Sequence, residues 1–343
     1  MRNKITNRHR QLCIGMLLSW TFIFCSPNIT FAESEKLLQP VGQTVGITLQ
    51  MDGVTIVDTA DFEDQDGKSQ NPAKDAGIKA GDIIKKMDGK HVADTKALDA
   101  AVQEGNEIVV SYERNGKLEE TTITPYLAEA DGRYHIGVWV KDAASGIGTV
   151  TYIDPETGQF VALGHGISDP SSGQILEISE GDILKSTVVS VQKGGRGEPG
   201  ELIGVFADGR EKLGDIERNT LTGLVGSVDD ISAFQTACEP VPIAKRENVH
   251  EGTAYILSNI EGNKVEKFEV EIQKINKDTE STKGMVIKVT DGRLLEKTGG
   301  IVQGMSGSPI IQDDHFVGAV THVFVNAPEK GYAIFMDALP KAD

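Results

Sequence analysis

Cysteine is scarce in this chain of 343 residues, which contains only three. Cys13 and Cys25 lie in or beside an apolar segment near the N-terminus, which leaves Cys238 alone in the rest of the chain. One cysteine cannot form an internal disulfide, and it cannot build a cysteine-based zinc site. The sequence therefore predicts a fold that depends on its hydrophobic core, with no metal ion and no cofactor.

Positive charge is also in deficit, because 34 Lys and Arg residues face 51 Asp and Glu residues, for a formal net charge of −17 at pH 7. The sequence contains no basic stripe and no glycine-rich loop of the P-loop type. An acidic protein repels the phosphate backbone of nucleic acids. We therefore predict that nucleic acid is not a partner.

Long apolar runs are absent apart from Leu12 to Phe24, which follows four basic residues and precedes the small-x-small motif Thr30-Phe31-Ala32. A helix of this length spans about 20 Å, which is less than the hydrocarbon layer of about 30 Å. The arrangement is typical of a secretory signal peptide. We predict that residues 1–32 direct export across the cytoplasmic membrane and are removed, with a retained membrane anchor as the alternative.

A compact module of short strands follows this segment. The sequence Asn71-Pro72-Ala73-Lys74-Asp75-Ala76-Gly77-Ile78, continued by Gly81-Asp82-Ile83-Ile84, predicts a short helix that turns into a strand. It resembles the PDZ domains attached to bacterial proteases, and the resemblance continues through a helix around Thr95 to Gln103. We assign residues 40–125 to an N-terminal PDZ domain of the α+β class.

A PDZ domain binds an extended peptide as an additional strand, and amides of a glycine-containing loop receive the terminal carboxylate. The candidate loop is residues 42–47, which precede a predicted strand. The residues predicted to contact a peptide are Gly42, Val45, Gly46 and Ile47. The alternative is that these glycines only form a turn.

From Ile136 onward, short strands alternate with glycine-containing turns, which favours a barrel or a sandwich. The hexamer Gly304-Met305-Ser306-Gly307-Ser308-Pro309 places a serine between glycines in a tight turn. Such a turn exposes a hydroxyl that can attack a carbonyl, beside amides that stabilise the oxyanion. Ser306 is the candidate nucleophile, with the amides of Gly304 and Ser306 as the oxyanion hole. A plain turn between strands is the alternative.

A serine hydroxyl needs a base to take its proton, and histidine suits this task. His165, which lies between glycines directly after an apolar strand, is the candidate base. His322 has the surroundings of a buried strand and is predicted to be a core residue. The carboxylate that orients the base is Asp291, 15 residues before Ser306, or Asp169, four residues after His165. Both aspartates can simply stabilise turns, so the residues alone do not decide between them.

The hexamer resembles the Gly-Asp-Ser-Gly-Gly-Pro signature of trypsin-like peptidases, with Met305 and Ser308 as departures. Residues 298–311 and 318–326, supported by residues 162–167 and 214–223, resemble the stage IV sporulation protein B peptidases of spore-forming bacteria. This resemblance implies a trypsin-like β-barrel serine peptidase domain over residues 134–340, in a chain that is mainly β. It also implies that His165, Asp291 and Ser306 form the catalytic triad.

The resemblance further implies a function in sporulation signalling. Members of this family are exported serine endopeptidases that cleave a membrane-bound regulator, and also themselves, so that an intramembrane protease can process a late sigma-factor precursor. The implied partners are that regulator, the chain itself and a peptide ligand of the PDZ domain. The implied location is the intermembrane space of the developing spore, with a membrane tether before processing. The alternative is a catalytically latent scaffold that acts through its PDZ domain.

Overall fold

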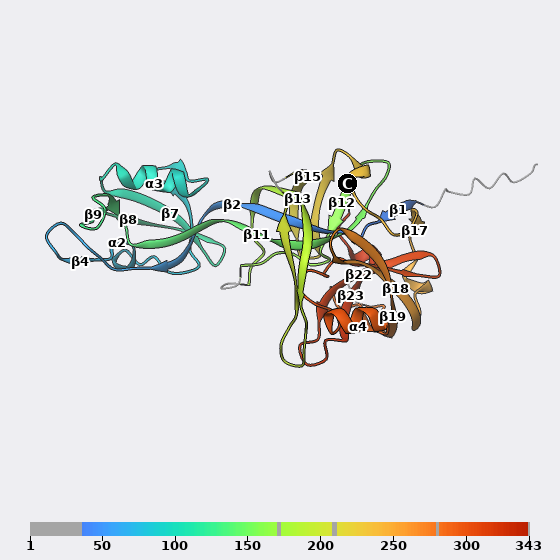
Figure 1. The fold of residues 1–343 in the computed structure, drawn as a ribbon. Coiled ribbons are helices and arrows are strands. Elements are labelled where there is room, and N and C mark those ends of the chain that lie inside the picture. The colour runs from blue at the N-terminus through green and yellow to red at the C-terminus, as the bar shows by residue number, and fades with distance from the viewer. Residues whose placement is uncertain (1–35, 170–172, 208–210, 279–280, 342–343) are drawn as a thin grey trace, which may run out of the picture. The chain divides into compact units, whose positions relative to one another are not determined.

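The computed structural model describes residues 36–169, 173–207, 211–278 and 281–341 (Figure 1). The predicted export segment, residues 1–32, lies outside this description. In the described ranges, no helix has both the length and the apolar character needed to cross a membrane.

Two long strands belong to both the PDZ-type module and the first barrel. They are β2, Thr44–Thr59, and β11, Val138–Ile153, which pair antiparallel from Val138 opposite Thr59 to Thr149 opposite Thr44 (Figure 1). Their register shifts at two places, and such bulges bend and twist a strand pair. The predicted domain limits of 40–125 and 134–340 place β2 in one domain and β11 in the other. In the structure, each of these two strands continues from the PDZ-type module into the first barrel.

The PDZ-type module is a sheet in the order β11-β2-β5-β7-β8, with two helices. Asn71 and Asp94 accept hydrogen bonds from the first turns of helices α2 and α3, as N-cap residues commonly do. Arg114 forms an ion pair with the buried carboxylate of Asp82. The elements are β3 (Phe62–Glu63), β4 (Ser69–Gln70), α2 (Pro72–Asp75), β5 (Ile83–Met87), β6 (Lys90–His91), α3 (Thr95–Gln103), β7 (Ile108–Arg114), β8 (Lys117–Ile123), β9 (Tyr126–Leu127) and β10 (Tyr134–His135).

The first barrel follows the strand order β11-β12-β16-β15-β13-β2, and the pairing of β2 with β11 returns this path to its start. Buried residues from all six strands, including Phe160 and Leu224, fill its interior. Its elements and neighbours are β1 (Leu37–Pro40), β12 (Gln159–Ala162), β13 (Ile178–Gln192), β14 (Glu201–Phe206), β15 (Lys212–Thr220), β16 (Gly223–Val228), η1 (Ile231–Ala233), β17 (Val241–Pro242) and η2 (Arg246–Asn248).

The second barrel is closed, in the order β18-β19-β20-β23-β22-β21. Its strands are β18 (Gly252–Glu261), β19 (Lys264–Ile275), β20 (Met285–Val289), β21 (Pro309–Gln312), β22 (His315–Val323) and β23 (Lys330–Phe335). Helix α4, Gly292–Thr298, lies between β20 and β21, and η3, Met336–Ala338, follows β23. The structure confirms the prediction of a mainly β chain with a PDZ domain ahead of a barrel-containing peptidase region.

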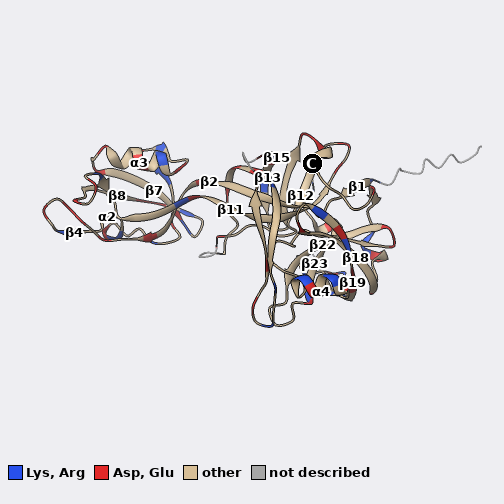
Figure 2. Cartoon of the chain, in the orientation of Figure 1, with Lys and Arg blue, Asp and Glu red and all other residues tan. Residues whose placement is uncertain are grey.

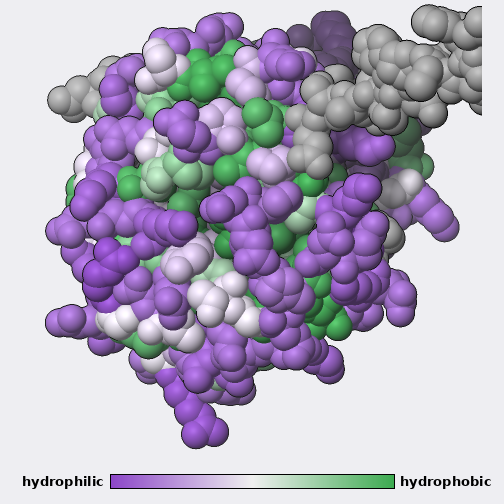
Figure 3. Space-filling view, turned by 90° about the vertical axis from the view of Figure 1, so that its right-hand side faces the viewer, coloured by the Kyte–Doolittle hydropathy of each residue, from purple (hydrophilic) through white to green (hydrophobic). Residues whose placement is uncertain are grey.

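Charged residues of both signs are spread along the described part of the chain (Figure 2). Basic residues are dispersed among acidic ones along the ribbon (Figure 2). The face shown in Figure 3 is mainly hydrophilic, with apolar residues in small separate areas. Scattered apolar residues of this kind are normal on the surface of a folded protein.

Thr151 has a buried hydroxyl without a hydrogen-bond partner in the described part of the chain. Its side chain is fully buried on β11, and its hydroxyl has no partner among the described residues. Leaving a buried hydroxyl unpaired costs about 1–3 kcal/mol. We expect Thr151→Val, which keeps the shape of the side chain, to raise the free energy of unfolding by about 1 kcal/mol. Urea denaturation measures this change, and a lower stability of the variant would contradict the expectation.

Candidate active site

His165 and Ser306 line one cavity of about 340 Å³. His165 lies in the loop that follows β12 of the first barrel, three residues after Ala162, whereas Ser306 lies in the turn before β21 of the second barrel. The walls include apolar residues of the first barrel, among them Ile47, Ile147 and Leu163. The fold thus brings together the predicted base and the predicted nucleophile, which are far apart in the sequence.

The loop that carries His165 has an unusual backbone. Leu163 and Gly164 both have positive φ, 73° and 70°, so the chain turns sharply after β12. A left-handed conformation is unfavourable for leucine and persists only where the surroundings enforce it. The side chain of Asn219 fixes the far end of the loop, because it accepts from the amide of Ile167 and donates to the carbonyl of Ile167.

The ring of His165 is oriented by its own loop. Its Nδ1 lies 2.9 Å from the carbonyl oxygen of Gly166. A carbonyl oxygen can only accept a hydrogen bond, so Nδ1 must carry the proton in this arrangement. The other ring nitrogen, Nε2, then has the lone pair that a general base requires.

His322 packs against the candidate base, although the sequence predicted a core residue. The centroids of the two rings are 5.2 Å apart, with the rings tilted by 37°. His322 is exposed at the end of β22, yet its ring is partly desolvated by this packing. Desolvation, followed by the charges of His165 and Lys283, lowers the pKa of His322 below its usual value. The apolar sequence around His322 indicated the strand correctly but not the exposure at its end.

The hydroxyl of Ser306 donates a 2.8 Å hydrogen bond to the carbonyl oxygen of Thr321. Ser306 is half-buried, whereas Met305, which replaces the aspartate of the trypsin-like signature, is fully buried in the core of the second barrel. Gly307 follows with φ of 96°, and a Cβ there would lie 2.4 Å from the carbonyl oxygen of Thr149. Only glycine fits this position, which explains why the hexamer at 304–309 has glycine at 307.

Two amides of the nucleophile turn are free to bind a ligand. The N–H groups of Met305, Gly307 and Ser308 donate to backbone carbonyls within the second barrel and its turn. Those of Gly304 and Ser306 have no acceptor among the described residues. They are the two amides predicted to form the oxyanion hole, and both residues line the cavity.

Asp291 does not reach this cavity in the structure. Its carboxylate caps helix α4 by accepting from the amide of Arg293, and it forms an ion pair of 2.8 Å with the guanidinium of the same residue. The side-chain hydrogen bond from Arg293 lowers the pKa of Asp291. His165 is not among its hydrogen-bond partners, so the role that the resemblance implies for Asp291 stays a prediction.

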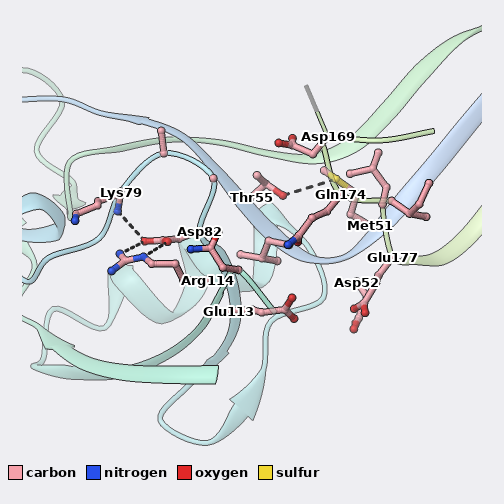
Figure 4. A pocket seen from close by; sticks show the side chains of 16 residues that line it. Met51, Asp52, Thr55, Lys79, Asp82, Glu113, Arg114, Asp169, Gln174 and Glu177 are labelled. Atoms are coloured by element: carbon pink, nitrogen blue, oxygen red, sulfur yellow. Dashed lines mark hydrogen bonds and ion pairs between the residues drawn. The ribbon is translucent and has the colours of Figure 1, made fainter. Parts of the chain in front are cut away.

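Asp169, the alternative carboxylate, lies in another cavity. Its carboxylate forms an ion pair of 3.0 Å with Lys141. It contributes to the wall of a cavity of about 390 Å³, together with Glu177, Asp82 and Arg114 (Figure 4). The two aspartates thus pair with Lys141 and Arg293, whereas the Nδ1 of His165 lies at hydrogen-bond distance from the carbonyl of Gly166.

The residues predicted to bind a PDZ ligand lie instead in the first barrel: Gly42, Val45, Gly46 and Ile47. Strand β2 is paired on both sides at this point, because Ile47 lies opposite Gly146 of β11 and opposite Ile183 of β13. A peptide cannot add as a strand where both edges are occupied. The structure thus corrects this assignment. Val45, Gly46 and Ile47 belong to the paired strand β2, and Gly42, just before it, donates to the carbonyl of Val150 in β11.

Another edge of the PDZ-type sheet is available. Val138–Lys141, at the start of β11, pair with β2 on one side and with no described strand on the other. Trp139 in this segment is 67% exposed. Gly137 precedes it with φ of 74°, and its amide has no backbone acceptor among the described residues. A free edge behind a glycine loop is the arrangement by which PDZ domains bind peptides. In the sequence, the signal for this free edge was Gly137 between the apolar residues Ile136 and Val138.

Comparison with known families agrees with this geometry. The family described as SpoIVB peptidase S55 matches residues 132–339, and the PDZ domain matches residues 44–124. The first match covers more than half of the chain and includes His165, Asp291 and Ser306. The chain belongs to the SpoIVB peptidase S55 family. It is a serine endopeptidase with a PDZ domain ahead of the peptidase region.

Other similarities to this S55-family chain are partial. A stretch of 95 residues is 33% identical to the Lactococcus lactis protein LL2128, which is named as a zinc metalloprotease; it covers 27% of the chain and 20% of that relative. The PDZ domain of the SdrC-like protein of Listeria monocytogenes is 23% identical, with a TM-score of 0.22, over 26% of this chain and 90% of that one. An HtrA-type protease, AlgW with a decapeptide, is 10% identical, with a TM-score of 0.33, over 87% of this chain and 62% of that one. Both TM-scores lie below 0.5, so the family assignment depends on the sequence match.

The name of that relative refers to zinc, which is bound by His, Cys, Asp and Glu side chains placed close together. Across the part of the chain that the structure describes, no group of three or more His, Cys, Asp or Glu side chains is placed to hold a metal ion.

Proposed function

We propose that this S55-family peptidase acts through Ser306 as nucleophile and His165 as general base. The observation that carries this proposal is that the two residues, one from each barrel, line one cavity in which the amides of Gly304 and Ser306 have no acceptor among the described residues. In acyl transfer, Ser306 Oγ bonds to the scissile carbonyl carbon while its proton passes to His165 Nε2. The proton then goes to the leaving amine as the C–N bond breaks, and water hydrolyses the acyl-enzyme.

The resting position of the Ser306 hydroxyl has a consequence for this reaction. The hydroxyl donates to the carbonyl of Thr321, so it has to rotate away from this acceptor before its proton can pass to His165. Hydrogen bonds at catalytic groups commonly tighten only when substrate is bound. The amides of Gly304 and Ser306 would then bind the oxyanion, which is worth about 10²–10³ in rate for each donor.

We further propose that the substrate is a membrane-bound regulator, and at some sites the chain itself, cleaved outside the cytoplasmic membrane in the intermembrane space of the developing spore. The family match and the apolar segment at residues 12–24 support this proposal. Cleavage of the regulator would release an intramembrane protease to process a late sigma-factor precursor. The free edge at Val138–Lys141 would bind a peptide of the substrate or of the chain's own terminus.

The test is reconstitution in a bacterium that does not form spores. The full chain is produced together with the membrane-bound regulator, the intramembrane protease and the sigma-factor precursor, and immunoblots follow the regulator and the precursor. We expect a regulator fragment and processed precursor with the wild type and neither with Ser306→Ala. Equal processing with both chains would contradict the proposal, and binding without cleavage by the wild type would favour the latent scaffold.

A further inference from the structure

Thr149 is a buried residue of β11 whose three polar groups all contact the two halves of the active site. Its hydroxyl donates a 2.7 Å hydrogen bond to the carbonyl oxygen of Gly304. Its amide donates to the carbonyl of Ser306 at 3.3 Å, and its own carbonyl accepts from the amide of Leu163 at 3.1 Å. One residue of the first barrel thus joins the nucleophile turn to the loop that carries His165.

The contacts of Thr149 fix the orientation of two peptide units in the nucleophile turn. A peptide unit is planar, so a hydrogen bond to its carbonyl fixes the direction of the N–H on the following residue. Thr149 fixes the units that follow Gly304 and Ser306, and the N–H groups of these units, on Met305 and Gly307, donate to Val302 and Val320.

The two amides predicted to form the oxyanion hole belong to the neighbouring peptide units, Gln303–Gly304 and Met305–Ser306. The carbonyl of Gln303 accepts from Leu202, and the carbonyl of Met305 accepts from Ser308. The following amides, on Gly304 and Ser306, remain unpaired among the described residues. Because each unit shares an α-carbon with a unit held by Thr149, a shift at Thr149 would tilt both amides.

We propose that Thr149 is a positioning residue that holds the nucleophile turn and the base loop in register across the two barrels. This inference rests on the proposed function of Ser306 and His165. Thr149 does not line the cavity, so it acts through the groups that it holds. The fit is close, because a Cβ on Gly307 would lie 2.4 Å from the carbonyl oxygen of Thr149 and 2.6 Å from the amide nitrogen of Leu163.

The experiment compares Thr149→Val, which removes the hydroxyl donor, with Thr149→Ser, which keeps it. Thr151→Val is the matched control, because Thr151 is buried on the same strand and its hydroxyl has no partner among the described residues. The rate of labelling of the full chain by a fluorophosphonate, and kcat and KM for a peptide that the wild type cleaves, are measured together with Tm. Thr149→Cys, with a weaker donor, provides a second variant if Thr149→Val folds poorly.

We expect Thr149→Val to lower the labelling rate and kcat about 10- to 100-fold, because small displacements of catalytic groups cost up to about 10² in rate. KM is expected to change less than about twofold, since the hydroxyl touches no substrate. Thr149→Ser should stay within about threefold of the wild type, Thr149→Cys should lie between the two, and Thr151→Val should match the wild type.

Three results would overturn the inference in distinguishable ways. If folded Thr149→Val is labelled at the wild-type rate and only its Tm falls, Thr149 has a structural role alone. If Thr149→Ser is as impaired as Thr149→Val, the hydroxyl donor is not what matters. If the wild type itself is not labelled, the proposed function fails, and the role of Thr149 fails with it.

Discussion

Ser306→Ala is expected to lower turnover by about 10⁶-fold, the scale found when a serine peptidase loses its nucleophile. The folded structure should be preserved, because the half-buried hydroxyl makes one hydrogen bond among the described residues, to the carbonyl of Thr321. Turnover of a peptide substrate, measured beside Tm, checks this expectation.

The neighbouring Ser308 offers a matched control. Its side chain is fully buried and its hydroxyl lies 3.3 Å from that of Ser258, so it has a packing role. Ser308→Ala should keep activity within about threefold and lose about 1 kcal/mol of unfolding free energy. Equal loss of activity in both variants would contradict the choice of Ser306 as nucleophile.

His165→Gln is expected to reduce turnover nearly as much as Ser306→Ala, by about 10⁶-fold. Glutamine has no group that takes a proton near neutral pH, whereas the Nδ1–Gly166 contact leaves Nε2 of His165 free to do so. Residues that act as a unit are not additive, so the double variant should be no slower than either single variant. A further loss in the double variant would mean that the two residues act independently.

Asp291 needs a separate test. The family resemblance implies that it orients His165, whereas the structure gives it another partner. The structure pairs it with Arg293 at the start of α4. We expect Asp291→Asn and Arg293→Gln to lower Tm and turnover in parallel, since both remove the same ion pair. A folded Asp291→Asn that loses about 10⁴ in turnover, beside an active Arg293→Gln, would make Asp291 the orienting residue of the triad.

The features that the sequence predicted correctly are those encoded locally. The hexamer at 304–309 indicated a tight turn because glycine fits positions that a side chain would block, and Gly307 meets that condition. The short helix predicted after Asn71 and the helix predicted around Thr95 to Gln103 are present as α2 and α3, capped by Asn71 and Asp94. Turn and capping preferences depend on a few neighbouring residues, so a single sequence is enough to detect them.

The features that the sequence did not reveal depend on distant pairing. Residues 42–47 resemble a peptide-binding loop locally, but Ile47 is flanked by strands that start 91 and 131 residues later in the chain, at Val138 and Ile178. Thr149 carries no local signal, because its hydroxyl meets Gly304 across 155 positions. The exposure of His322 depends on where β22 ends beside His165, which alternation of apolar residues cannot show.

The central claim, an activated serine at position 306, is tested most directly by covalent labelling. The purified full chain and its Ser306→Ala variant are incubated with a fluorophosphonate, and intact mass and peptide mapping locate the adduct. The account predicts one adduct on Ser306 in the wild type and none in the variant. A folded wild type without adduct, or an adduct that persists in Ser306→Ala, would contradict it.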